Sequence, residues 1–396
     1  MVAGKKADPI NQRVIQLQGS MAQAGIGMAL IVHPRDVFYY AGTTRPSVLV
    51  VTPDDCMLFV RRGYERVWKE ATISKTRVMG GFESIARWLQ PKQLAPGKIG
   101  TELDVAPIEV VRRMAAVFPK WGLADISPVV QAQRAIKEVS EIDAMRESCR
   151  VADLGMEAAS GFLVEGISEL ALAAEVEAVV RRAGHEGYPP LRDPSARGGG
   201  IFVISGHGLT IRGGHGRVIT GAGLGPTSPY GPSRRAIRHG DVVVVDMALS
   251  VGGYGADEAR TFIVGEAPDD QRALMDVASK AQDAVIAALR PGVTGAELYA
   301  AADEVAKEGA PPHFNPGSLA IPGFIGHGVG LEVDEIPLLA RDDDMPVQKG
   351  MTLAIEIEVS AVMKRKMVKL EDVVVVRADG CEFLTHTPRG IIECGV

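Results

Sequence analysis

Hydrophobic and polar residues follow two different patterns along the chain, and the first pattern fills residues 1–130. Short apolar runs bounded by turn residues predict strands over 27–33, 47–52 and 56–61, and helical spacing predicts helices over 11–24, 82–90 and 106–118. The turn residues Pro53, Asp54 and Asp55 predict that the last two strands form a hairpin. We therefore expect a small α/β domain, in which no cluster of catalytic side chains stands out.

Residues 131–396 instead repeat one order of elements, two helices followed by two strands. Helices are predicted over 140–163, 169–184, 269–290 and 295–309, and strand pairs within 240–265 and 351–377. The first of these helices is expected to begin at Ser140, where Asp143 follows three residues later. The repeated order suggests an internal pseudo-repeat within a second, larger domain.

The first strand pair carries two acidic residues, Asp246 and Asp257. Gly252 and Gly253 between the strands predict a tight antiparallel hairpin. Pairing across it is expected to set the two carboxylates opposite each other on one face. Because like charges repel at that distance, the hairpin needs a partner of opposite charge.

The second strand pair carries acidic residues in the same way. Glu356 and Glu371 are expected to face each other across a turn near Met363 and Lys364. Buried carboxylates are unfavourable without a compensating charge, and hard divalent cations prefer carboxylate oxygens. The two pairs therefore predict a shared metal site at the junction of the two halves.

A histidine among glycines supplies a fifth candidate ligand. His327 is enclosed by Gly326, Gly328 and Gly330. Glycines let the backbone approach closely and leave the imidazole accessible, as a metal ligand requires. A glycine-rich turn with a structural histidine is the alternative interpretation, and the four carboxylates favour the ligand.

Composition narrows the classes of function. The 396 residues are 46% hydrophobic and 23% charged, which is typical of a soluble protein of two or three domains. A net charge of -6 without a basic run argues against nucleic acid or an anionic membrane as the main partner. The chain shows neither a signal peptide nor an apolar run of the roughly 18 residues that span a membrane, so a cytoplasmic location is expected. Four scattered cysteines predict neither a disulfide framework nor a zinc knuckle.

The acidic and histidine segments resemble a known family. GDVVVVDMALSVGGYGADEARTF, GHGVGLEVDE, GMTLAIE and KLEDVVVV are similar, in order and spacing, to the metal-binding segments of methionine aminopeptidase, aminopeptidase P, prolidase and creatinase. The resemblance covers residues 137–396, and PRDVFYYAG and IKEVSEIDAMR extend it over the rest. It implies an α+β chain, with a creatinase-like α/β domain over 1–130 and a pita-bread catalytic domain over 131–396.

The resemblance also implies roles for the five ligands. Asp246 and Asp257 would bind one divalent ion, His327 and Glu356 the other, and Asp257 and Glu371 would bridge the two. Four ionised carboxylates and two such ions, of Mn, Co, Zn or Fe, sum to zero charge, (-4) + (+4). Glu356 is also the candidate to carry a proton from the attacking water to the leaving amine, although a role as ligand alone fits equally well.

Some positions depart from the family's pattern. Peptidases of the family carry a second histidine seven residues after the first, where this chain has Asp334, which when ionised cannot donate a hydrogen bond. The upstream histidine expected near the substrate is His207 or His215, and we prefer His215. Our candidate catalytic residues are therefore Glu356, His215 and Asp334.

Glu358 and Lys369 are the candidate substrate-binding residues. The register that pairs Glu356 with Glu371 also pairs Glu358 with Lys369. By the same resemblance, Lys369 stands where aminopeptidase P and prolidase have arginine. The two residues either shape a pocket for an unusual substrate or form a local ion pair.

The function implied is dinuclear metal-dependent hydrolysis of an N-terminal Xaa-Pro or related amide bond in a short peptide. One alternative is a hydrolase or lyase of a small, amino-acid-like substrate, as in creatinase or ectoine hydrolase. Another is a catalytically silent binding module of the same fold. Retention of all five ligands favours the hydrolase. The resemblance also implies a homodimer in which the small domain of one subunit narrows its partner's cleft.

Overall fold

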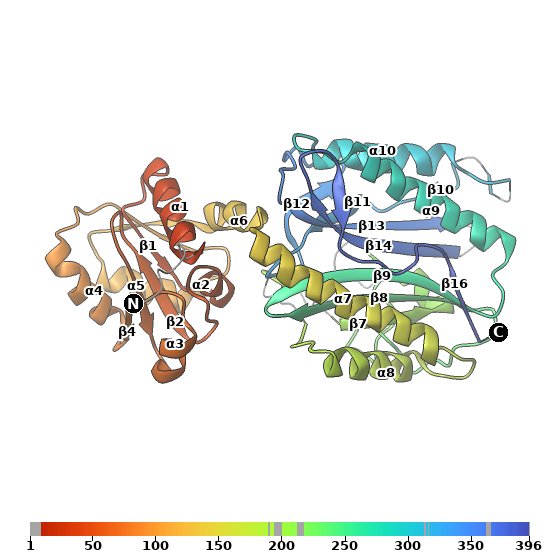
Figure 1. Ribbon diagram of the computed structural model, residues 1–396, viewed down its shortest axis with the longest axis horizontal. Coiled ribbons are helices and arrows are strands. Elements are labelled where there is room, and N and C mark those ends of the chain that lie inside the picture. Colours follow the sequence, from red (N-terminus) through yellow and green to blue (C-terminus); the bar gives the residue numbers. More distant parts are fainter. Residues whose placement is uncertain are drawn as a thin grey trace, which may run out of the picture. The chain divides into compact units, whose positions relative to one another are not determined.

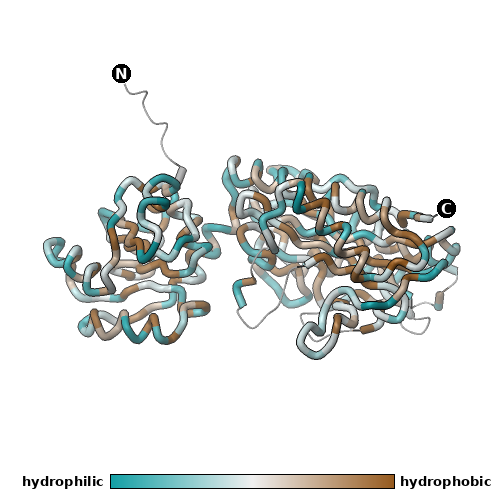
Figure 2. Tube along the Cα trace, turned by 90° about the horizontal axis from the view of Figure 1, so that it is seen from below, coloured by the Kyte–Doolittle hydropathy of each residue, from teal (hydrophilic) through white to brown (hydrophobic). Residues whose placement is uncertain are grey.

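The computed structural model describes residues 9–188, 191–193, 200–211, 218–312, 314–315, 317–361 and 366–395. The chain folds into two compact units, Met1–Arg134 and Ala135–Val396, which are described separately (Figure 1). In each unit the hydrophobic segments gather on the inner strands and helix faces, and the turns are polar (Figure 2).

The first unit is built on a six-stranded sheet in the order β4-β3-β2-β1-β5-β6. Its strands are β1 Met28–Ile31, β2 Ser47–Val51, β3 Cys56–Val60, β4 Thr76–Val78, β5 Lys98–Thr101 and β6 Gly122–Asp125. Its helices are α1 Pro9–Gln23, α2 Pro34–Ala41, α3 Tyr64–Glu70, α4 Phe82–Leu89, η1 Gln90–Lys92, α5 Ile108–Val117 and α6 Ser127–Ala135. β2 and β3 pair antiparallel, which confirms the predicted hairpin.

Three strands of this sheet were not predicted. β4, β5 and β6 have only three or four residues each, and β4 and β6 are largely exposed or half-buried. Such short segments lack a hydrophobic period, and they become strands because they lie parallel to β3, β1 and β5 respectively. A core of α4, α5 and strand side chains holds the sheet together.

The second unit is built on a ten-stranded sheet whose main path is β12-β11-β13-β14-β9-β8-β7. Its strands are β7 Gly200–Ser205, β8 Val242–Val251, β9 Tyr254–Val264, β10 Leu319–Ala320, β11 Phe324–Gly328, β12 Glu335–Ala340, β13 Thr352–Ala361, β14 Lys366–Val376, β15 Cys381–Phe383 and β16 Ile392–Cys394. Its helices are α7 Val139–Phe162, α8 Glu169–Arg182, η2 Gly206–Thr210, α9 Asp269–Ala288 and α10 Gly295–Glu308. The predicted order of helix pair, strands, helix pair, strands is confirmed.

The predicted start of α7 at Ser140 is wrong by two residues. Glu138 is the N-cap, and its backbone N–H donates to Glu141 Oε2 at 2.9 Å in a capping box. The Glu141 carboxylate, at the third helical position, accepts the hydrogen bond from the backbone N–H of Glu138. The helix therefore begins at Val139, and Ser140 lies inside its first turn.

The predicted register of the first acidic hairpin is also wrong, by two residues. Val251 pairs with Tyr254 across Gly252 and Gly253, so Asp246 lies opposite Ala259 instead of Asp257. Because side chains alternate with a period of two, a shift of two keeps both carboxylates on one face, where they are diagonal neighbours. In the second hairpin the predicted pairs of Glu356 with Glu371 and of Glu358 with Lys369 are confirmed.

Helices cover one face of the large sheet. α9 packs on β13 and β14, and α7 packs on β8 and β9 (Figure 1). Ile355 and Leu370 point into the apolar core beneath α9. Since neighbouring residues of a strand point to opposite faces, Glu356 and Glu371 lie on the other face.

None of the helices within the described residues is both long and apolar enough to cross a membrane. The four cysteines are free thiols.

Candidate metal centre

The five candidate ligands stand on five neighbouring strands of the large sheet. In sheet order they are His327 on β11, Glu356 on β13, Glu371 on β14, Asp257 on β9 and Asp246 on β8. Segments more than a hundred residues apart in sequence therefore present these side chains side by side.

Strand pairing puts the four carboxylates on the same face. Ala259 lies opposite both Asp246 and Glu371, and Glu371 lies opposite Glu356. Asp257 is two residues before Ala259 on the same strand, so its side chain points the same way. The row of pairs crosses four strands without a break.

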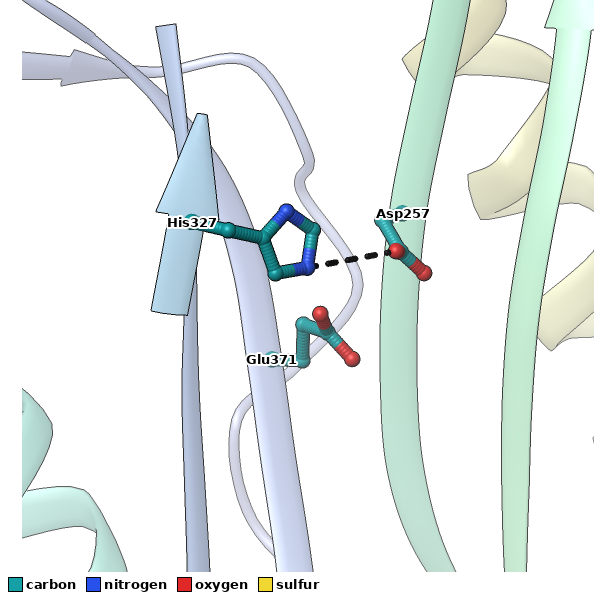
Figure 3. A group of neighbouring side chains, drawn as sticks. All are labelled: Asp257, His327 and Glu371. Carbon is teal, nitrogen blue, oxygen red and sulfur yellow. Dashed lines mark ion pairs between the residues drawn. The ribbon is translucent and has the colours of Figure 1, made fainter. Parts of the chain in front are cut away.

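His327 completes the row from β11. It lies opposite Ala354, two residues before Glu356 on β13. Ligand atoms of His327, Asp257 and Glu371 all lie within 4.8 Å of one another (Figure 3). The Nε2 atom of His327 is 3.8 Å from Asp257 Oδ2 and 3.7 Å from Glu356 Oε1.

The orientation of the imidazole suits a metal ligand. His327 Nδ1 is 3.0 Å from the carbonyl oxygen of Gly328. Because a carbonyl oxygen only accepts, Nδ1 carries the proton, and in the neutral ring the lone pair belongs to Nε2, which faces the carboxylates. Close packing of β12 against β11 requires glycine here, since a Cβ at position 328 would lie 2.3 Å from the Ile336 carbonyl oxygen.

Lys369 enters the same cluster from β14. Its Nζ lies 2.6 Å from Asp246 Oδ2, 2.9 Å from Glu356 Oε2 and 3.1 Å from Glu371 Oε2. The ion pairs of this side chain therefore run to three of the candidate ligands rather than to Glu358, its partner in the strand register. The local ion pair with Glu358, one of the two interpretations of the register, is replaced by contacts with the candidate ligands.

The charges of the cluster shift its pKa values. Burial, and then repulsion from Glu371 and Asp246, raise the pKa of Asp257 well above its usual range. Burial, together with repulsion from Glu356 and Asp246 and against the opposing charge of Lys369, raises the pKa of Glu371 to about 8.

The basic groups shift in the direction that the carboxylates favour. Burial acts to lower the pKa of His327, but Asp334, Glu356 and Glu371 outweigh it and raise that pKa. In the same way Asp246, Glu356 and Glu371 outweigh burial and raise the pKa of Lys369. The cluster therefore favours positive charge at its centre.

Asp334 lies at the rim. Its side chain is 58% exposed, and Oδ1 is 3.5 Å from His327 Nε2. An exposed carboxylate beside the imidazole is in reach of a molecule that approaches the centre, but it can only accept hydrogen bonds when ionised.

Of the two candidate histidines upstream of β8, the structure describes only His207. His215 lies outside the described residues. His207, in η2, is exposed and lines a cavity of about 360 Å³ with Gly240, Asp241 and Val242 at the beginning of β8. Asp246 is further along β8 and is not part of that lining.

Glu358 is buried beside the centre. Its side chain is 1% exposed, and Oε2 accepts a hydrogen bond from the backbone N–H of Ile219 at 3.3 Å. Lys369 is opposite it in the register of β13 and β14.

Arg260, which was not predicted from the sequence, is buried and links two ligand strands from the opposite face. Its guanidinium donates to the carbonyl oxygen of Glu371 at 2.5 Å and to Asp372 Oδ1 at 2.6 Å. Glu258 Oε1 lies 3.2 Å away. Strand alternation could have indicated this triad, because Glu258, Arg260 and Asp372 each stand one residue from a ligand or its partner.

The donor set fits a divalent metal ion. Glu371 Oε2 is buried and accepts no hydrogen bond from the described residues. Carboxylate oxygens with one imidazole nitrogen suit Mn, Co, Fe or Zn. The repulsion that raises the pKa of Asp257 and Glu371 would be relieved by a cation as well as by protons.

The fold and this centre define a pita-bread metalloenzyme. Comparison with family models identifies "Metallopeptidase family M24" over residues 143–378 and "Creatinase/Prolidase N-terminal domain" over residues 13–136. The chain belongs to metallopeptidase family M24, which confirms the resemblance and the predicted α+β architecture.

Relatives and solved structures align with nearly the whole chain. The Xaa-Pro dipeptidase of Pyrococcus furiosus is 28% identical over 97% of this chain and 100% of its own length. Among solved structures, the prolidase from Pyrococcus furiosus is 26% identical with a TM-score of 0.74, covering 94% of this chain and 99% of that one. The Xaa-Pro dipeptidase from Bacillus anthracis has a TM-score of 0.81 at 23% identity over 97% of this chain and 99% of its own, a likeness in fold.

Proposed function

We propose that this protein is a metal-dependent peptidase that cleaves the N-terminal Xaa-Pro bond of short peptides. The observation that carries the proposal is the convergence of four carboxylates and one imidazole from five neighbouring strands on one face. Relatives named Xaa-Pro dipeptidase, aligned over nearly the full length, support the choice of substrate.

The residues of the centre have separable tasks in such a reaction. When bound, a divalent ion supplies a Lewis acid for the scissile carbonyl and lowers the pKa of the attacking water. Asp257, His327 and Glu371 would hold the ion, with Asp246 at the β8 side. Glu356 has one oxygen near His327 Nε2 and the other beside Lys369, so it can pass a proton from the water to the leaving amine.

We propose that Asp334, at the exposed edge of the centre, and residues beside the centre recognise the substrate. Asp334, exposed beside His327, is suited to accept a hydrogen bond from the free α-amino group of a peptide. We keep His215 as a candidate donor to the substrate, and we keep Glu358 and Lys369 as residues that shape the pocket.

Manganese is our first choice of ion, with Co, Zn and Fe as alternatives. Two ions were expected from the family resemblance, and the count of carboxylate and metal charges agreed with that number. That count leaves out Lys369, whose ammonium lies among the same oxygens. The number of bound ions therefore depends on whether this ammonium stays among the carboxylates.

Two wider expectations belong to this proposal. We expect a homodimer in which the small domain of one subunit narrows the cleft of its partner, which light scattering of the purified chain would test. We also expect a cytoplasmic location, which fractionation of the source cells would test.

A substrate screen tests the proposed activity. We expect purified protein supplied with Mn²⁺ to release the N-terminal residue from Xaa-Pro dipeptides or tripeptides, and chelation to abolish this. Glu356→Gln should lower kcat by at least ~10²-fold because the amide cannot carry the proton. The ion content of this variant separates the two roles, since a proton carrier leaves it unchanged and a ligand lowers it.

The matched control is Glu382→Gln on β15, whose carboxylate pairs with Arg146 and Arg377 away from the centre. It should retain full activity. Turnover that survives both chelation and Asp257→Asn would refute the mechanism. Turnover of N-acylated amino acids or other small amides in place of Xaa-Pro peptides would favour the creatinase-like alternative, and no turnover of either, the binding module.

A further inference from the structure

A lysine side chain lies where the two acidic hairpins meet. Lys369 is 5% exposed, and its ammonium contacts Asp246 from β8, Glu356 from β13 and Glu371 from β14. Of these contacts, the one with Asp246 Oδ2 at 2.6 Å is a hydrogen bond. A compact unit charge is thus held by three of the four carboxylates that were expected to bind metal.

The backbone fixes this lysine at the centre. Lys369 N–H donates to Thr261 Oγ1 at 2.9 Å, and the same hydroxyl donates to the Lys369 carbonyl at 2.8 Å. Thr261 is on β9, so the lysine is tied to the strand that carries Asp257. The strand register then directs the side chain to the same face as Glu371, two residues on.

The remaining ligands describe one ion position. Asp257, His327 and Glu371 offer one atom each, and these atoms all lie within 4.8 Å of one another. Glu371 Oε2 is buried and accepts no hydrogen bond from the described residues, and the Lys369 ammonium lies 3.1 Å from it as an ion-pair partner. Asp246 is on β8, at the end of the row of ligand strands that is farthest from His327. Its Oδ2 already accepts a hydrogen bond from the Lys369 ammonium.

We propose that the Lys369 ammonium takes the place of one of two cations, so that the centre binds a single divalent ion between Asp257, His327 and Glu371. Lysine suits this role because its ammonium is a compact point charge, whereas the planar guanidinium of arginine spreads its charge over a wider fork. A second divalent ion at Asp246 has to displace or approach this ammonium, and two positive charges within about 4 Å repel strongly in a buried site.

The inference rests on the proposed metal-dependent function, and counting ions separates the two. Metal-stripped protein is titrated with Mn²⁺, and bound ions are counted by native mass spectrometry and elemental analysis. We expect one ion per chain in the wild type and two in Lys369→Met. The second binding step should be at least ~100-fold tighter in the variant, because the repulsion is gone.

The spectrum of bound Mn²⁺ gives a second measurement that does not depend on activity. Wild type should show the electron paramagnetic resonance signal of an isolated ion, and Lys369→Met that of a coupled pair. Lys369→Gln, which keeps a polar side chain of similar length, serves if the methionine variant does not fold. The matched control is Lys366→Met on the same strand, where the lysine pairs with Asp270 and should leave the count at one.

Each possible ion count either supports or overturns a specific claim. Two ions in the wild type, or one ion in both Lys369 variants, overturns the inference and leaves the proposed function intact. No bound ion in any folded protein overturns the metal-dependent function itself. One ion in the wild type and two in a Lys369 variant establishes the ammonium as the second cation.

Discussion

Two buried carboxylate environments in this protein contrast with each other. At the centre, Asp257 and Glu371 are surrounded by other acids, and a cation is needed to relieve their repulsion. In the first unit, Glu102 is fully buried and accepts hydrogen bonds from the backbone N–H groups of Val32 and His33. The effect of burial on the pKa of Glu102 can therefore be measured without the influence of a bound metal ion.

The pKa of Glu102 predicts a pH dependence for the first unit. Burial, and then repulsion from Asp36, raise this pKa to about 7 from an ordinary value of 4.5. The folded state therefore binds a proton that the unfolded chain releases, so stability is full below about pH 4.5 and is lost as pH rises through about 7. The loss is at most ~3 kcal/mol in the free energy of unfolding.

Tryptophan fluorescence measures this effect selectively, because Trp68, Trp88 and Trp121 all belong to the first unit. Urea unfolding followed by fluorescence should show lower stability at about pH 8 than at about pH 5. Glu102→Gln, which cannot titrate, should remove most of that difference. An unchanged pH profile in this variant would contradict the assignment to Glu102.

At the scale of elements, the ligand side chains stay on the site face only when the register of their strands shifts by an even number of residues. The β8–β9 hairpin differs from its predicted register by two residues, and both aspartates remain on the site face. A slip of one would have moved Asp246 to the face that α7 covers. The two-residue period therefore explains why the ligands could be identified although their pairing was not.

Helix caps are the other local feature with a measurable effect. Thr294 caps α10, where its Oγ1 accepts a hydrogen bond from Glu297 N–H at 3.2 Å and Glu297 Oε2 accepts one from Thr294 N–H at 2.8 Å. Thr294→Ala should destabilise the second unit by ~1 kcal/mol. Far-UV circular dichroism and hydrogen exchange within α10 measure this, because the tryptophans report only on the first unit.

Thr294→Ser is the matched control, since it keeps the hydroxyl and should restore nearly all of the lost stability. Equal destabilisation by serine and alanine would mean that the methyl group, and not the cap, is responsible.

At the scale of the whole molecule, two units with separate cores share one chain. An ion that binds only the folded second unit stabilises that unit by mass action, by ~3 kcal/mol at a hundred times its dissociation constant. We expect chelation to increase hydrogen exchange in β9, β13 and β14 and to leave the first unit unchanged.

Hydrogen exchange with mass spectrometry, with and without chelator, makes this comparison in the intact protein. Peptides from β1 and β2 are the internal control, because their strands belong to the other sheet. Equal loss of protection in both units would show that the ion stabilises the chain as a single cooperative unit.

The sequence by itself determined the features that depend on local order and period. Gly252 and Gly253 define one hairpin, alternation places Glu356, Glu358, Lys369 and Glu371 on one face, and the acidic and histidine segments together indicate the family. Each of these follows from neighbours along the chain, so a pattern of residues is enough to reveal it.

Only the tertiary structure decided what depends on contacts between distant strands. It placed His327 opposite Ala354, brought β14 beside β9, buried Arg260 across the back of two ligand strands and turned Lys369 into the carboxylate cluster. A side chain's partners in a sheet are set by which strands lie side by side, and that order follows from packing of the whole core.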